Sequence, residues 1–197
     1  MIDNMDPIVS QIRKCICSGD SSELEKIVNE YASYSFQDDP DYRKFDQHVF
    51  DLILEMMAQP AFLNMEGSYY LLRLFEYDWS MLVPSQTDKL LTAIECSYDK
   101  YSDWMSCFVL SQLLGKNYCN GKAFQAIIKL NNTSKEIPRS LLPMALEYLA
   151  HGNNSDPVLK DKAMLELTRL ASDSADRVRQ EAIESLDRLT NRGTVQT

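Results

Sequence analysis

The chain has 197 residues, a mass of 22.6 kDa and a hydrophobic share of 45%, values typical of a globular protein rather than a disordered or collagen-like one. A chain of this length hides about 70% of its unfolded surface on folding, which is enough for one sizeable core. It contains only six glycines, too few for the many tight turns of a sheet-rich fold. The composition therefore favours an all-α protein.

Charge is unevenly distributed along the chain. The whole chain carries 20 Lys and Arg against 29 Asp and Glu, a net charge of −9. Residues 1–103 carry 8 basic against 19 acidic residues, or −11, whereas residues 104–197 carry 12 against 10, or +2. A negative field disfavours nucleic acid and anionic membranes as ligands and complements a basic protein partner. The alternative is an acidic surface that serves only solubility.

The cysteines and the first twenty residues favour a cytoplasmic location. Five cysteines make an odd number without framework spacing, which is typical of a reducing compartment. Asp3, Asp6, Arg13 and Lys14 interrupt the apolar residues near the start, so we expect no signal peptide there. No apolar run reaches the length of about 18 residues that a membrane span needs. We therefore expect a cytoplasmic protein that does not bind membranes.

Local signals predict a series of helices. Three Asp-Pro pairs place a capping side chain before a proline, which predicts helices beginning at Pro7, Pro40 and Pro157. Ser22 and Glu25 form a capping-box pattern that predicts another helix start. Apolar residues at helical spacing extend the second and third of these Asp-Pro helices over residues 41–59 and 157–171, and they predict further helices over residues 68–82, 86–100, 103–115, 121–131, 139–151 and 176–191. We therefore predict an all-α fold, an irregular stack of about ten helices.

The last two predicted helices repeat one another at an offset of 19 residues. Seven similar pairs come into register: Leu159 with Val178, Lys160 with Arg179, Ala163 with Ala182, Met164 with Ile183, Leu167 with Leu186, Arg169 with Arg188, and Leu170 with Leu189. A central alanine in each helix lets two backbones approach, while the larger residues fill the layer between them.

The pattern Asp176-x-Val178-Arg179-x-x-Ala182-x-x-x-Leu186-x-x-Leu189 resembles the second helix of a HEAT or armadillo-type repeat. These families form solenoids of helical pairs. The resemblance implies a HEAT-like pair at about residues 155–191 within an α-α superhelix. We expect a single all-helical domain over residues 1–192, followed by a frayed tail over residues 193–197.

Residues that could perform catalysis or bind metal are sparse. His48 and His151 are the only histidines, about a hundred residues apart, and structural roles explain both. Cys15-x-Cys17 lacks the second pair of a zinc site, so buried or half-buried thiols explain it better. The stretch 115–122 has the wrong spacing for a phosphate-binding loop. We therefore expect no enzymatic activity, no metal and no cofactor.

Acidic and aromatic residues are interleaved in the first half of the chain. Tyrosine and tryptophan are favoured at protein interfaces, where they combine a large contact area with a polar end. The candidate partner-binding residues are Asp38, Asp39, Asp41, Glu66, Tyr69, Glu76, Asp78, Trp79, Asp99 and Asp103. Two alternatives stay open: helical spacing allows Tyr70, Phe75 and Trp104 in the core, and the acids at 38–41 could cap a helix.

In size, acidity and helical build, the chain resembles bacterial immunity proteins, including those that protect producers from the nuclease toxins of contact-dependent growth inhibition. The resemblance implies a non-catalytic inhibitor that covers a basic toxin domain with its acidic surface. It is one of overall character and assigns no individual binding residue. The competing hypothesis is a HEAT-like adaptor or scaffold that binds another partner without inhibiting it.

Overall fold

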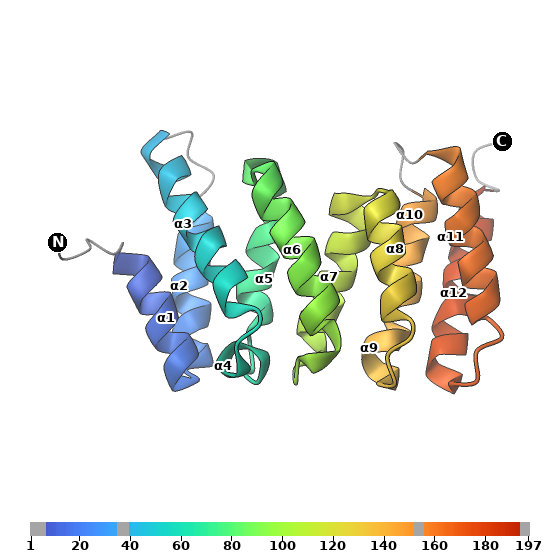
Figure 1. Cartoon of the computed structure of the whole chain (residues 1–197), viewed down its shortest axis with the longest axis horizontal. Coiled ribbons are helices and arrows are strands. Elements are labelled where there is room, and N and C mark those ends of the chain that lie inside the picture. The colour runs from blue at the N-terminus through green and yellow to red at the C-terminus, as the bar shows by residue number, and fades with distance from the viewer. Residues whose placement is uncertain (1–6, 35–39, 152–155, 194–197) are drawn as a thin grey trace. The chain divides into compact units, whose positions relative to one another are not determined.

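The computed structural model describes the backbone of residues 7–34, 40–151 and 156–193. It describes the side chains of these ranges except for residues 31–46, 192 and 193. Every regular element within the described residues is a helix, so the all-α prediction is confirmed (Figure 1).

Backbone contacts divide the chain into two compact units, Met1–Ser106 and Cys107–Thr197. We call them the N-terminal and the C-terminal unit. The division falls inside helix α7 (Trp104–Gln112), close to the change in charge after residue 103. Because residues 104–106 carry no charge, the N-terminal unit holds the whole −11 and the C-terminal unit the +2. The single domain over residues 1–192 stays a prediction.

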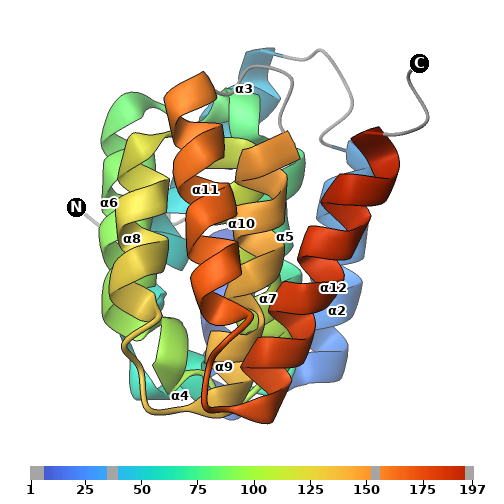
Figure 2. The same ribbon diagram turned by 90° about the vertical axis from the view of Figure 1, so that its right-hand side faces the viewer.

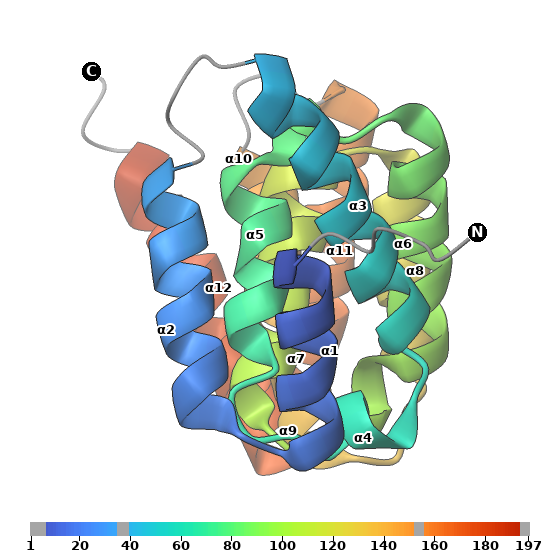
Figure 3. The same cartoon turned by 90° about the vertical axis from the view of Figure 1, so that its left-hand side faces the viewer.

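The N-terminal unit is a set of helices around an aromatic core. Its elements are α1 (Pro7–Ser18), α2 (Ser21–Tyr34), α3 (Pro40–Met56), α4 (Pro60–Leu63), α5 (Tyr69–Tyr77), η1 (Trp79–Met81), α6 (Pro84–Ser97) and η2 (Tyr98–Lys100). Helix α1 contacts α2, α3 and α4, and α5 contacts α2 and α3 (Figure 3). Phe50, Phe62, Phe75 and Tyr98 are fully buried, and the rings of Phe50 and Phe75 stack 5.5 Å apart.

Two helix starts in the N-terminal unit follow the Asp-Pro signals, and two others differ from the prediction. Helices α1 and α3 begin at Pro7 and Pro40 as predicted. The predicted capping box at Ser22 is wrong, because the side chain of Asp20 accepts a 3.0 Å hydrogen bond from the Glu23 amide and α2 begins at Ser21, so the cap lies two residues earlier. Pro60, which directly follows the predicted helix over residues 41–59, begins the short helix α4.

The C-terminal unit packs around α10. Its elements are η3 (Leu113–Tyr118), α8 (Gly121–Leu130), α9 (Glu136–Ser140), α10 (Leu142–His151), α11 (Pro157–Leu170) and α12 (Asp176–Gly193). Helix α10 contacts η3, α8, α9, α11 and α12, and Figure 2 shows α11 and α12 beside it. Leu142, Ala145, Leu146 and Leu149 of α10 are fully buried.

Burial in α11 and α12 agrees at two of the corresponding apolar pairs, whereas Leu186 and Leu189 of α12 are only half-buried where Leu167 and Leu170 of α11 are buried. Ala163 and its counterpart Ala182 are both fully buried, and the two helices contact one another. Leu159 and Val178, which also correspond, are buried as well. Asp156 caps α11 by accepting a 3.0 Å hydrogen bond from the Val158 amide, as the Asp-Pro signal predicts.

The helix predicted over residues 103–115 does not end at Gly115. Helix α7 continues into the π-helical segment η3, and Gly115 is buried within it. A Cβ atom at this position would lie 2.6 Å from the Ala145 carbonyl oxygen of α10 and 2.8 Å from the Tyr148 Cβ. The glycine is therefore required by close helix packing rather than by a turn.

Candidate functional site

A pocket of about 330 Å³ opens on the N-terminal unit where three segments meet. The start of α2, the turn into α5 and the start of α7 contribute its lining: Ser21, Ser22, Glu25, Glu66, Gly67, Tyr69, Tyr70, Asp103, Trp104 and Met105. We call it the Tyr69 pocket. Helices α2 and α5, which form two of its walls, lie side by side in Figure 3.

A glycine allows two of these segments to approach. Gly67 has a φ of +87°, in the left-handed region that favours glycine, and it is buried. A Cβ there would lie 3.3 Å from both the Ser21 Cβ and the Tyr70 ring. The absence of a side chain at Gly67 thus brings the start of α2 close to the start of α5.

Polar contacts fix the third segment of the pocket. The Asp103 carboxylate accepts hydrogen bonds from the backbone amides of Met105, at 2.9 Å, and Gly67, at 3.4 Å. The hydroxyl oxygens of Ser68 and Ser106 are buried and lie 2.8 Å apart. Because these contacts join the first turn of α7 to the turn before α5, Asp103 has a structural role in addition to its charge.

Two adjacent tyrosines form the aromatic wall of the pocket. The ring centroids of Tyr69 and Tyr70 lie 4.2 Å apart, and the Arg73 guanidinium carbon lies 5.6 Å from the Tyr69 ring. A hydrogen bond with Tyr69, burial and a hydrogen bond with Glu25 raise the pKa of Tyr70 well above its ordinary value. Tyr70 therefore stays a neutral phenol over the whole physiological pH range.

The lining of the Tyr69 pocket is acidic. It contains the carboxylates of Glu25, Glu66 and Asp103 and no Lys, Arg or His side chain. Glu66 is exposed and makes no hydrogen bond or ion pair with another residue in the described part of the chain. The Trp104 side chain at the rim is 53% exposed. Carboxylates and exposed aromatic rings together attract cations.

The Tyr69 pocket brings together some of the predicted partner-binding residues and not others. Glu66, Tyr69 and Asp103 line it. Glu76, Asp78 and Trp79 lie at the opposite end of α5, about 12 Å along the helix axis, and Asp99 lies in η2 outside the lining. Asp38 and Asp39 lie outside the residues that the structure describes. Asp41 lies in α3, where the structure describes its backbone but not its side chain.

Three residues of the pocket lie in surroundings that differ from those the sequence predicts for them. The sequence places Glu25 in a capping box, whereas it lines the pocket and helps to raise the pKa of Tyr70. Asp20, directly before the Ser-Ser pair, was the signal that could have revealed the true cap. The core placement of Trp104 is wrong because its side chain is exposed, and Tyr70 is only half-buried. The core placement of Phe75 is confirmed.

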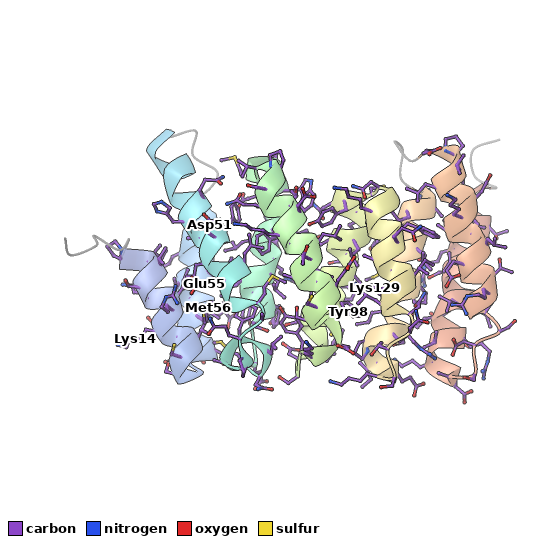
Figure 4. The ribbon with its side chains drawn as sticks, in the orientation of Figure 1. Lys14, Asp51, Glu55, Met56, Tyr98 and Lys129 are labelled. Carbon is purple, nitrogen blue, oxygen red and sulfur yellow. The ribbon has the colours of Figure 1, made fainter. Side chains whose placement is uncertain are left out.

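A second hollow of about 620 Å³ runs between α3 and α6. Its lining is mixed and includes Asp51 and Glu55, one turn apart on α3 (Figure 4), together with Asp88 and Lys89 of α6. Asp51 accepts a 3.1 Å hydrogen bond from Gln86, and Glu55 forms a 3.0 Å ion pair with Arg13. Because Arg13 already neutralises Glu55 and Lys89 lines this hollow, whereas no basic side chain lines the Tyr69 pocket, the Tyr69 pocket is the better candidate for binding a cation.

Candidate metal ligands do not gather in the described part of the chain. No group of three or more His, Cys, Asp or Glu side chains there is arranged to hold a metal ion. His48 and His151 are both exposed. Cys15 is buried, but Cys17 is exposed, so the predicted burial of this pair is wrong for Cys17.

None of the helices in the described ranges combines the length and the apolar character needed to cross a membrane. Comparison of the chain with protein-family models, curated proteins and solved structures finds no significant match in any of the three. Function is therefore inferred from charge and geometry alone.

Proposed function

We propose that this protein is a non-catalytic binding protein whose acidic N-terminal unit recognises a basic protein partner. The coincidence of charge with structure carries the proposal, because one compact unit holds the whole negative excess. Every acidic side chain that the structure describes in this unit is exposed or half-buried. Such a one-sided field accelerates association with a positively charged protein and disfavours acidic ones.

Inhibition of a basic nuclease is the most concrete form of this function, and it would make the protein an immunity protein. A nuclease presents a cationic surface to the phosphates of its substrate. An acidic unit of about 100 residues can cover that surface and compete with nucleic acid through the same electrostatic attraction. In this proposal the C-terminal unit, with its HEAT-like pair α11–α12, serves as a supporting scaffold.

A HEAT-like adaptor is the second candidate, and exposed apolar residues on α11 favour it. Leu165 is 72% exposed and Val158 is 56% exposed. They are seven residues apart and so lie on the same side of the helix. In an adaptor, this side of α11 would contact a partner whose own activity is preserved.

Affinity capture distinguishes the two candidates. The tagged full-length protein is incubated with extract of its native host at low salt, and retained proteins are identified by mass spectrometry and assayed for nuclease activity. We expect one stoichiometric basic protein whose nuclease is silent in the complex and active after separation by salt. A partner that is equally active in the complex would favour the adaptor. Retention of no basic protein would overturn the charge-based proposal.

Two charge variants test whether retention of the partner depends on the charges of the N-terminal unit. The N-unit charge variant carries Glu23→Gln, Glu66→Gln and Asp88→Asn, three exposed acids of the N-terminal unit. The C-unit charge variant makes the same change in net charge with Asp161→Asn, Glu181→Gln and Asp187→Asn in α11 and α12. We expect the N-unit variant to retain less of the partner than the C-unit variant does. Equal retention by both would show that the location of the charge does not matter.

A further inference from the structure

The Tyr69 pocket has the size for one side chain rather than for a helix or a loop. Its volume of about 330 Å³ lies at the lower limit of typical small-ligand sites. It is formed by three segments of one unit, which Gly67 and Asp103 hold together. A bulky ligand would have to separate these segments, whereas a single extended side chain would not.

The chemistry of the lining favours a cation that can also stack on an aromatic ring. Glu66 offers carboxylate oxygens without a hydrogen-bond partner among the described residues, and Glu25 adds a second, half-buried carboxylate to the lining. The Asp103 carboxylate accepts two backbone amides and adds its negative charge. Trp104 at the rim provides exposed ring surface.

One ring of the aromatic wall, Tyr69, already contacts a cationic side chain of the protein itself. The guanidinium of its own Arg73 lies 5.6 Å from the Tyr69 ring centroid, within the range of a cation–π contact. Arg73 does not line the pocket, and neither does any other basic side chain. The carboxylates of the lining are therefore not neutralised by a cation within the lining. A second guanidinium, supplied from outside, would complement both the charge and the rings.

We infer that the Tyr69 pocket binds the guanidinium group of an arginine side chain that the basic partner presents. Arginine fits better than lysine because its planar group stacks on aromatic faces and its five N–H donors match several acceptors at once. The ammonium group of lysine is more strongly hydrated and loses more on entering a pocket. The nature of the partner rests on the proposed function, but the preference for guanidinium belongs to the pocket.

Binding can be measured without the partner. The chain has two tryptophans, so the Trp79→Phe variant leaves Trp104 at the pocket rim as the sole tryptophan reporter. Its fluorescence is followed during titration with millimolar N-acetyl-arginine amide, with the neutral isostere N-acetyl-citrulline amide and with the lysine analogue. We expect saturable binding of the arginine probe, at least about tenfold weaker binding of citrulline, and intermediate binding of lysine.

A parallel nuclear magnetic resonance titration of the wild-type protein, reading the Trp104 indole signal, covers the case in which Trp79→Phe disturbs folding. An unchanged signal with the arginine probe, or an equal response to citrulline, would overturn the inference. High salt is expected to weaken arginine binding, because the attraction is electrostatic.

Single-charge variants identify the pocket as the site. Glu66→Gln is expected to weaken the arginine probe by about fivefold, since it removes one of three lining carboxylates. Glu23→Gln removes the same charge from α2 near the pocket but outside its lining, and is expected to change binding less than about twofold. Equal weakening by both variants would mean that the general field, and not the pocket, binds the probe.

The pocket and the proposed function can fail separately. If the arginine probe binds as expected but capture retains no basic protein, the pocket inference stands and the proposed function fails. If a silent basic nuclease is captured but the Glu66→Gln variant binds both it and the arginine probe as the wild type does, the proposed function stands and the pocket inference fails.

Discussion

Replacement of Gly115 by alanine should destabilise the C-terminal unit. The new Cβ would lie 2.6 Å from the Ala145 carbonyl oxygen and 3.0 Å from the Ala145 Cα. Both are backbone atoms, so they cannot move aside as a flexible side chain would. Helix α10 would have to shift as a whole, and it also contacts α11 and α12.

The size of the effect follows from two opposing contributions. Overpacking of a tight interior site costs up to about 3 kcal/mol. The higher helix propensity of alanine over glycine returns about 1 kcal/mol. We therefore expect Gly115→Ala to lower the free energy of unfolding by about 2 kcal/mol, measured by urea denaturation followed by circular dichroism.

Gly121 provides a matched control in the same unit. It begins α8, is exposed, and a Cβ there would meet no atom within 4 Å. Gly121→Ala should be neutral or stabilise the protein by up to about 1 kcal/mol. If Gly115→Ala were as stable as the wild type, or if both variants shifted stability equally, the close contact between η3 and α10 would be refuted.

Three further changes test the packing and the ion pairs. Ala182→Asp places an unpaired charge at a fully buried position of α12 and should cost several kcal/mol in thermal or urea unfolding. Arg188→Leu removes the 2.9 Å ion-pair partner of Glu147, whose side chain is only 7% exposed, and should cost about 3 kcal/mol, part of which an added Glu147→Gln restores. The ion pair with Arg13 lowers the pKa of Glu55, so its stabilisation is present above the unfolded-state pKa of 4.5 and is lost as the pH falls through the folded-state value. Both side chains are about a third or more exposed, so the ion pair is partly screened by water. We therefore expect Glu55→Gln to reduce the loss of unfolding free energy between pH 6 and pH 3, measured by urea melts, by less than about 1 kcal/mol.

Each of these changes has an outcome that would contradict it. Ile183→Asp, at the neighbouring and 39% exposed position, should cost clearly less because its carboxylate can reach water, so equal losses from Ala182→Asp and Ile183→Asp would mean that the α12 register is misassigned. If the Glu147→Gln change added to Arg188→Leu deepened the loss, the cost would not come from an unpaired carboxylate. An unchanged slope of stability against pH in Glu55→Gln would show that this ion pair contributes nothing.

Local signals in the sequence predicted most helix positions. Proline with a preceding aspartate acts within one turn, and α1, α3 and α11 all begin at such a proline. The burial of Ala163 and Ala182 was also predictable, because the 19-residue register repeats the same apolar face twice.

Features that depend on partners from elsewhere in the chain were not predictable. Gly115 would end a helix by its intrinsic preference, yet α10 lies so close that only glycine fits within η3. Trp104 has the spacing of a core residue but lies at the rim of a pocket. Helical periodicity shows which residues share a face, and it does not show whether another element covers that face.

The composition of the candidate site was only partly predictable for the same reason. The interleaving of acids and aromatics selects Glu66, Tyr69 and Asp103, and these three residues meet in one pocket. It also grouped them with Glu76 and Asp78, which lie at the other end of α5. The contribution of α2 to the pocket depends on the close approach of Ser21 to Gly67, a contact that no sequence motif predicts.

Stopped-flow association of the captured partner tests most directly whether the N-terminal unit recognises it by charge. The association rate constant is measured for the wild type and for the two charge variants at low and at physiological salt. We expect the N-unit charge variant to associate roughly threefold to tenfold more slowly at low salt, with a weaker salt dependence, and the C-unit charge variant to match the wild type. Equal association rate constants for all three proteins would contradict recognition through the acidic unit.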